Sequence, residues 1–280
     1  MKKLFCLCAA LLVLFAGCGK ATPANAPTDF TSVPSTANQT TPQENGQEYR
    51  AMWISYLELN SLKGADETTF RQQAGQMVEN CKQLGLNTII FQVRPFGDAL
   101  YSSQLFPQSH ILSGTQGQNI GYDPLQIFIE ETHQRGMKLE AWVNPYRIQL
   151  NSNQPASLAA NNPAVQHPEW AVSANGGLYY NPALPEVQQL VVDGVKEIIT
   201  NYDVDGIHFD DYFYPTTEES FDADTYAQMG QGMSLADWRR QNVNQLVKKV
   251  YTTIKETDSS IRFGISPQGN NANNYDQQYS

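Results

Sequence analysis

The acidic composition of this 280-residue chain limits what it can bind. The chain has 28 acidic and 18 basic side chains and a formal net charge of −10, so we expect no nucleic-acid partner. It shows no internal repeat of the solenoid kind, and the part after residue 48 has the length of one large α/β domain.

Residues 1–18 predict a lipoprotein signal peptide and lipobox. Lys2 and Lys3 form a basic start, and the apolar run at residues 7–16 is too short to span a bilayer. Ala16 and Gly17 precede Cys18, which resembles the lipobox in which the cysteine becomes lipidated. We therefore expect an exported protein on the extracytoplasmic side, anchored to a membrane only through lipid on Cys18. Plain secretion and an uncleaved anchor are the alternatives.

Residues 19–48 predict a flexible linker, because Thr, Pro, Asn, Gln and Ala dominate and bury little. Cleavage before Cys18 removes two lysines and no acid, which changes the net charge from −10 to −12. It also removes Cys6 and Cys8. Cys81 then remains in the folded part, where we expect a small buried hydrophobe and no intramolecular disulfide.

From residue 49 to residue 280, strand-like runs alternate with helical stretches, which is typical of a parallel sheet with crossover helices. Helices are predicted to begin after the caps Asp66 and Asp123, at Pro185, and after the cap Ser234. The five strand runs are Ala51–Tyr56, Asn87–Arg94, Lys138–Asn144, Gly206–Tyr212 and Ile261–Ser266.

The alternation of side chains along these strands favours a (β/α) barrel. In the fourth run, Ile207 and Phe209 share one face, while His208, Asp210 and Tyr212 share the other. The other runs repeat this pattern of one apolar face and one face that turns polar toward the carboxyl end. An open doubly wound sheet would be apolar on both faces, and no Gly-rich phosphate loop follows the first strand.

The segment from Gly206 to Pro215 carries the strongest functional signal. Asp210 follows a barrel strand beside a second carboxylate, Asp211, and several aromatic residues. Glycosidases present their catalytic acids in this way, so Asp210 and Asp211 are the candidate catalytic residues. By strand parity Asp211 points away from the interior or into the loop. In the alternative interpretation, each carboxylate pairs with an arginine or caps the loop.

Several blocks of sequence, in the same order, resemble glycosyl hydrolase-like family 10, which consists largely of bacterial envelope lipoproteins. The family includes a division-associated enzyme that cuts peptidoglycan glycan strands stripped of peptides. The resemblance implies a cell-envelope glycosidase that acts on β-linked N-acetylated sugar polymers. The matching blocks are Arg50–Trp53, Gln92–Tyr101, Tyr122–Leu125, Ala141–Arg147, Asp210–Tyr212, Trp238–Arg240 and Phe263–Pro267.

Carried over block by block, the resemblance places Asp210 with the catalytic acids and a set of polar and aromatic residues in the sugar cleft. Arginine forks can bind hydroxyls, acetamides or a carboxylate, and aromatic rings offer flat faces to sugars. His208 is expected on the same side as Asp210, where it would tune its protonation or bind sugar. The candidate substrate-binding residues are Gln92, Arg94, Asp98, Trp142, Asn144, Tyr146, Arg147, His208 and Tyr212.

We expect no metal and no other cofactor, because the four histidines are scattered and none has a paired ligand spacing. A polysaccharide deacetylase would need such a metal set. The main alternative to a glycosidase is a non-catalytic glycan-binding lipoprotein. The sequence does not indicate an oligomeric state.

The number of strands predicts an incomplete barrel. A (β/α)8 TIM barrel needs eight strand-helix units, whereas about five are found here, and the resemblance implies three further strands. We therefore expect a C-terminally truncated barrel domain with its first and fifth strands as edges. A second catalytic carboxylate would be Asp98, Asp211 or a residue beyond this chain, so neither retention nor inversion is predicted.

Overall fold

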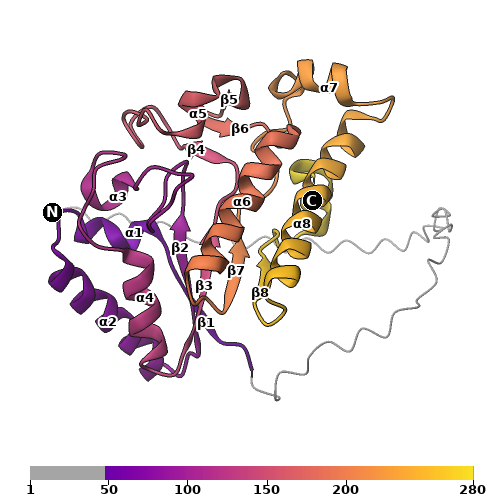
Figure 1. The fold of residues 1–280 in the computed structure, drawn as a ribbon. Coiled ribbons are helices and arrows are strands. Elements are labelled where there is room, and N and C mark those ends of the chain that lie inside the picture. Colours follow the sequence, from indigo (N-terminus) through magenta and orange to yellow (C-terminus); the bar gives the residue numbers. More distant parts are fainter. Residues whose placement is uncertain (1–47, 280) are drawn as a thin grey trace, which may run out of the picture. The chain divides into compact units, whose positions relative to one another are not determined.

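The computed structural model describes residues 48–279, which belong to one compact unit (Figure 1). The predicted signal peptide, Cys18 and the linker up to residue 47 lie outside the described residues. None of the helices in the described part combines the length and the apolar character needed to cross a membrane.

Five parallel strands form the main sheet, in the order β1-β2-β3-β7-β8. Each lies within a predicted run, so the strand prediction is confirmed. The chain leaves β7 at Phe209 and turns at Asp211, whose φ is 47°, so the predicted continuation to Tyr212 is wrong. Within the described residues the sheet stays open, with β1 and β8 as edges. The strands are β1 (Ala51–Ile54), β2 (Thr88–Arg94), β3 (Lys138–Val143), β7 (Gly206–Phe209) and β8 (Arg262–Ile265).

The four predicted crossover helices are present: α2 (Glu67–Gln83), α4 (Pro124–His133), α6 (Pro185–Asn201) and α8 (Leu235–Thr257). The side chains of Asp66, Asp123 and Ser234 accept hydrogen bonds from amides of the first helical turn, as their cap positions predict. Cys81 in α2 is a free, buried thiol, as expected. The shorter helices are α1 (Tyr56–Leu59), η1 (Asn60–Leu62), α3 (His110–Ser113), α5 (Pro163–Gln166), η2 (Pro168–Trp170), η3 (Glu219–Phe221), α7 (Ala223–Met229), α9 (Asn271–Asn273) and η4 (Asn274–Gln278).

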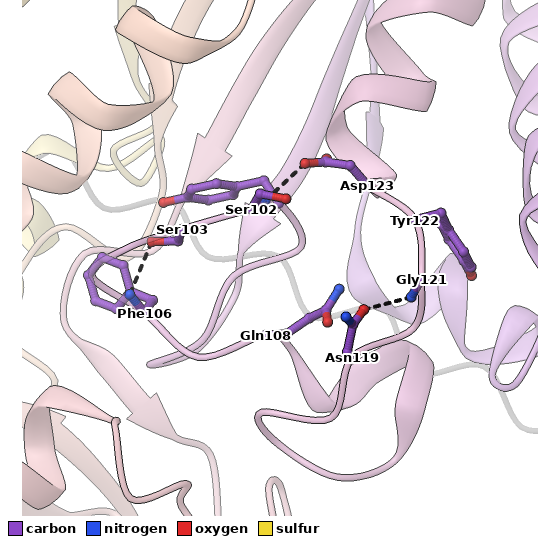
Figure 2. A pocket seen from close by; sticks show the side chains of 9 residues that line it. Ser102, Ser103, Phe106, Gln108, Asn119, Gly121, Tyr122 and Asp123 are labelled. Carbon is purple, nitrogen blue, oxygen red and sulfur yellow. Dashed lines mark hydrogen bonds between the residues drawn. The ribbon is translucent and has the colours of Figure 1, made fainter.

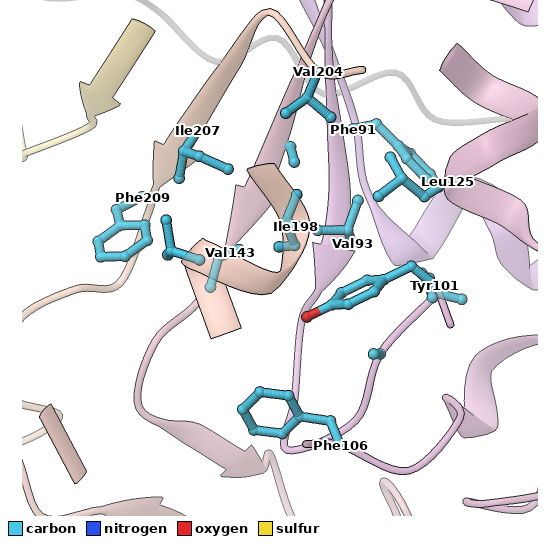
Figure 3. Packing of buried hydrophobic residues seen from close by; sticks show 14 of the residues in the cluster. Phe91, Val93, Tyr101, Phe106, Leu125, Val143, Ile198, Val204, Ile207 and Phe209 are labelled. Carbon is cyan, nitrogen blue, oxygen red and sulfur yellow. The ribbon is translucent and has the colours of Figure 1, made fainter. Parts of the chain in front are cut away.

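One face of the sheet packs against the helices and forms the core. Figure 3 shows Phe91 and Val93 of β2, Val143 of β3 and Ile207 of β7 grouped around Ile198 of α6. All five are at most 2% exposed. Each such side chain contributes about 1.5–3 kcal/mol through burial. The helices therefore cover the apolar face of the sheet, and the polar side chains of the strands lie on the opposite face.

A second, antiparallel sheet was not predicted. It consists of β4 (Arg147–Gln149), β5 (Ala171–Ala174) and β6 (Gly177–Tyr180) in the order β4-β6-β5. Asn175 and Gly176 form the β5–β6 turn, with φ values of 51° and 80°. Because this sheet is inserted between β3 and α6, it lies beyond the carboxyl end of β3, where it places Arg147 and Tyr179 in register with each other.

Candidate active site

The carboxyl ends of β3 and β7 bring Asn144 together with both predicted catalytic residues. The Asn144 amide nitrogen donates to the backbone oxygen of Asp210 at 3.1 Å and to Oδ2 of Asp211 at 3.2 Å. The two strands run in parallel register, with Trp142 opposite His208, so the residues that follow them meet at one edge. Asn144 therefore fixes the turn that carries the two acids.

Asp211 faces a cavity and does not point away from the site. Its Oδ2 lies 3.2 Å from Nη2 of Arg147, and its side chain is 45% exposed. Asp211 lies in the loop after β7 with a positive φ, so strand parity does not set the direction of its side chain, and of the two predicted directions the one away from the interior is not found. The cavity has a volume of about 150 Å³ and is lined by Tyr146, Arg147, Tyr179, Asp211, Phe213 and Pro215.

Asp210 is a partly buried acid in an electrostatic environment that favours its neutral form. Burial raises the pKa of its carboxyl group, and the negative charge of Asp211 raises it further. A hydrogen bond from the Asp211 backbone and the charges of Arg147 and His208 lower the pKa, but they do not outweigh the first two causes. The two consecutive side chains thus differ in their surroundings: Asp210 is partly buried and tends toward its neutral form, whereas Asp211 contacts Arg147 at the cavity.

Behind Asp210, a chain of hydrogen bonds runs through His208. Nδ1 of His208 lies 3.2 Å from Oε2 of Glu140, and Nε2 lies 2.7 Å from Oγ of Ser266. Glu140 is buried, and its Oε1 also lies 3.7 Å from Nε of Arg262. Ser266 was missed, although it follows β8 on the same strand face as Gly264, and this parity could have identified it.

Two glycines make room for the side chains of Glu140 and His208. A Cβ on Gly264 would lie 2.7 Å from Nδ1 of His208, and a Cβ on Gly206 would lie 2.7 Å from Cγ of Glu140. Both distances are far inside van der Waals contact. The glycines therefore allow a histidine and a glutamate to fill the interior face of neighbouring strands.

Trp142 and Gln92 support the cluster from β3 and β2. Trp142 packs edge-on against Trp53 at 4.6 Å, and Trp53 also packs against His208 at 4.7 Å between ring centroids. Gln92 is buried and donates from Nε2 to Oδ1 of Asn144 at 2.6 Å. Gln92 thus positions Asn144 and offers no surface to a sugar, whereas the half-exposed Trp53, which was not among the candidates, does.

Arg94 is not in the cleft, which corrects the prediction. The pairing of β2 with β3 shifts at Val93, so that Arg94 lies opposite Val143 on the helix-covered side. The guanidinium carbon of Arg94 lies 4.4 Å from the centroid of the Phe106 ring. Arg94 as a whole is 2% exposed. A β-bulge of one residue moves the next side chain to the other face, and the sequence pattern did not reveal it.

Asp98 is likewise a structural residue and not the partner of Asp210. It is fully buried, and its Oδ2 lies 2.7 Å from Nδ1 of His110 and accepts a hydrogen bond from Gln116. The prediction that Asp98 lines the cleft or supplies the second acid is therefore wrong for this structure, because its carboxylate has no access to a ligand.

The two predicted tyrosines differ in their roles. Tyr146 lines the cavity but is almost fully buried, and this burial raises the pKa of its phenol. Tyr212 is 3% exposed and packs edge-on against Phe213, so the prediction that it offers a stacking face is not supported. Tyr179, on β6, is only half-buried and, with the half-buried Phe213, provides an accessible ring of the cavity.

A larger cavity of about 500 Å³ lies in the loop between β2 and α4, and none of the predicted site residues lines it (Figure 2). Its polar groups are engaged within the loop: the Ser102 amide donates to Asp123, and the Gly121 amide donates to Asn119. Within residues 48–279, no three His, Cys, Asp or Glu side chains gather as metal ligands would.

The fold has counterparts among solved glycosidases of the TIM-barrel type. An alpha-L-fucosidase isoenzyme 2 from Paenibacillus thiaminolyticus superposes with a TM-score of 0.55 at 14% identity, over 79% of this chain and 32% of that one. The predicted fold class is thereby confirmed. Fold and site together define a glycoside hydrolase-like protein of the TIM-barrel type. The chain belongs to the family described as Glycosyl hydrolase-like 10, whose family model matches residues 48–280.

Two curated relatives agree with this family assignment and with the resemblance predicted from the sequence. Glycosyl hydrolase YngK of Bacillus subtilis (strain 168) is 41% identical over 246 residues, which are 85% of this chain and 48% of the relative. Glycosyl hydrolase DigH of Escherichia coli (strain K12) is 36% identical over 287 residues, which cover 93% of this chain and 63% of the relative. This chain thus spans about half of the first relative and less than two thirds of the second.

Proposed function

We propose that this protein is a glycoside hydrolase that cleaves O-glycosidic bonds of a cell-envelope polysaccharide, namely the glycan strands of peptidoglycan, with Asp210 as a catalytic carboxylate. The observation that carries the proposal is the cavity at Asp211, the residue that follows Asp210 in the chain: it combines the Asp211 side chain, an arginine in contact with it and an accessible tyrosine ring. These are the groups that a sugar-cleaving site needs: an acid, a charge that stabilises the transition state, and a stacking surface.

Asp210 is suited to protonate the oxygen of the leaving sugar. A general acid works best when its pKa lies near the working pH, and both burial and the Asp211 charge move the pKa of Asp210 in that direction. The chain from Glu140 through His208 to Ser266 would hold the polar groups behind Asp210 in place. We treat these three as positioning residues.

Asp211 would stabilise the positive charge that develops on the sugar ring. Its Oδ2 lies 3.2 Å from Nη2 of Arg147, and its side chain is half-exposed and lines the cavity. Arg147 itself stays in place because its Nε donates to the backbone oxygen of Pro95 at 3.1 Å.

The test is to incubate the protein with peptide-free glycan strands and to count new reducing ends. We expect Asp210→Asn to lower the rate at least 100-fold, as loss of general acid catalysis does. Asp193→Asn, an exposed acid on the outer side of α6, is the matched control and should leave the rate unchanged. Equal rates for wild type and Asp210→Asn would exclude Asp210 as the acid.

A second candidate function is glycan binding without cleavage. One observation favours it: Asp98 is buried, so that among residues 48–279 the candidate catalytic acids left at this site are Asp210 and Asp211, which are consecutive in the chain. Catalytic carboxylates usually flank the scissile bond from opposite sides. Binding of glycan strands that persists while no reducing ends ever appear would establish this alternative.

We further propose that lipid on Cys18 anchors the exported protein to a membrane, on the basis of residues 1–18. Cys18→Ala should move the protein from the membrane fraction to the soluble fraction. Membrane association that is unaffected by this change would contradict the proposed anchor.

A further inference from the structure

The cavity at Asp211 is smaller than the sugar ring that the proposed function places there. Its volume is about 150 Å³, whereas small-molecule sites usually have about 300–1,000 Å³. A cavity of about 150 Å³ holds a molecule of the size of benzene, and a pyranose ring with its substituents is larger. The walls of this cavity therefore have to separate before a sugar ring can enter.

Two segments that are far apart in the sequence form these walls. Arg147 of β4 and Tyr179 of β6 belong to the antiparallel sheet. Asp211, Phe213 and Pro215 belong to the loop after β7. The antiparallel sheet and this loop thus face each other across the cavity, and the contacts between them decide how easily it widens.

Two polar contacts join the walls. One is the pair of Arg147 and Asp211, at 3.2 Å. The other lies at the tip of the β5–β6 hairpin, where Nδ2 of Asn175 donates to the backbone oxygen of Pro215 at 2.8 Å. Asn175 is exposed and does not line the cavity. Water can therefore replace its hydrogen bond when the walls separate.

The loop wall is fixed from behind by α8. The fully buried Arg239 donates from Nη1 to the backbone oxygen of Thr216 at 3.5 Å and from Nη2 to that of Glu218 at 2.8 Å. It also forms an ion pair with the buried Asp222. Because breaking a buried ion pair is costly, this wall is expected to keep its place when a ligand enters.

The hairpin wall has a fixed base and an exposed tip. At the base, Tyr180 is fully buried and its amide donates to the backbone oxygen of Tyr146 at 2.8 Å. Toward the tip, Ser173, Asn175 and Gly176 are exposed. Segments with few buried side chains open at a lower free energy than the core does. The tip of the hairpin is therefore the part of the walls that can move.

We propose that the tip of the β5–β6 hairpin is a gate over the cavity at Asp211 and that Asn175 is its latch. The gate is closed in this structure, and a sugar ring enters after the hydrogen bond from Asn175 to Pro215 breaks. The inference rests on the proposed function and adds a positioning residue to it. Since only the open fraction of the protein binds, the latch lowers the apparent affinity for the glycan.

The first test is hydrogen exchange of the free protein, which needs no glycan. Asn175→Asp retains a residue that tolerates a positive φ, but its carboxylate cannot donate a hydrogen bond. We expect the amides of β5 and β6 to exchange about threefold faster, because an exposed hydrogen bond is lost, and those of α6 to be unchanged. The control is Gln231→Asp, which replaces an exposed turn residue with a φ of 49° outside the cavity. Unchanged exchange of β5 and β6 in Asn175→Asp would overturn the latch.

The second test is steady-state kinetics on peptide-free glycan strands. Asn175→Gly removes the donor without adding a charge and fits the positive φ of the turn. We expect KM to fall about threefold and kcat to stay nearly unchanged, because the open fraction rises. A purely structural contribution of Asn175 would raise KM or lower kcat, so either result overturns the gate. Gln231→Gly is the matched control and should alter neither constant.

The two tests separate the gate from the proposed function. Normal cleavage of glycan strands with unchanged hydrogen exchange in Asn175→Asp would overturn the latch and leave the proposed function intact. Accelerated exchange without cleavage by any of the proteins would support the latch and contradict the proposed function.

Discussion

Asp98 and Asp211 both follow parallel strands of one sheet, and each pairs with a basic side chain, but only one of them reaches a cavity. Asp98 is fully buried and holds His110 and Gln116, whereas the Asp211 side chain is 45% exposed and holds Arg147. Both aspartates lie within a few residues of the carboxyl end of a strand. Solvent access therefore separates a carboxylate that stabilises a loop from one that can act on a ligand.

The largest expected effect tests this comparison directly. Asp211→Asn should lower kcat/KM on glycan strands about 100-fold, because the charge facing the sugar is lost, while stability changes by less than about 1 kcal/mol. Asp98→Asn should lower the free energy of unfolding by about 3 kcal/mol, because it disturbs the buried hydrogen bonds that Asp98 forms with His110 and Gln116. Urea unfolding and initial rates measure the two quantities.

If Asp98→Asn lowers activity in the folded protein more than Asp211→Asn does, the distinction between the two carboxylates is wrong. Asp224→Asn, an exposed acid on α7, provides the baseline for both measurements.

A smaller effect is expected from the positioning chain behind Asp210. Glu140→Gln removes the charge that orients His208, so kcat should fall about tenfold with little change in KM. The pH profile of kcat should shift as well, a change that a purely structural role would not produce. Glu186→Gln at the exposed start of α6 is the control. A change confined to KM would place Glu140 outside the positioning chain.

A still smaller effect concerns the accessible ring of the cavity. Tyr179→Ala should raise KM about fivefold, because a stacking face of roughly 1 kcal/mol is lost, and should leave kcat nearly unchanged. Tyr251→Ala, an exposed tyrosine on α8, should alter neither constant. Steady-state kinetics on glycan strands distinguishes these outcomes, and an unchanged KM would remove Tyr179 from the binding surface.

The smallest expected effect is on stability as a function of pH. The pKa of Asp210 is raised in the folded state by burial and by Asp211, so its contribution favours folding at low pH and is lost as the pH rises through the folded pKa. At pH 7, Asp210→Asn should therefore be more stable than wild type, by no more than about 1 kcal/mol. The difference should vanish below about pH 4, near the unfolded pKa of aspartate. Denaturant titrations at both pH values test the sign.

The crossover elements of the main sheet could be predicted because their signals are local. Asp66, Asp123 and Ser234 cap three helices through side chains that reach amides a few residues away. The β5–β6 hairpin also had a local signal in Asn175-Gly176, a dipeptide typical of tight turns, but its strands have only four residues each and were overlooked.

The site was predicted less completely, because its geometry depends on departures from regular strands. Asn144 and Arg147 were expected in the cleft and lie beside Asp211. Arg94 was expected there too, but a one-residue bulge turned it to the helix side. Ser266 lies on the strand face that parity indicates, but its contact with His208, 58 residues away, was not predicted.

The order of amino acids was sufficient to determine the alternation of strands and helices, the apolar face of each strand and the family, since periodicity and capping act over a few residues. Only the tertiary structure decided which charged side chains remain accessible. That outcome depends on a bulge at Val93, a left-handed turn at Asp211 and the packing of distant loops around Asp98. Burial is a property of the whole arrangement, and no short segment specifies it.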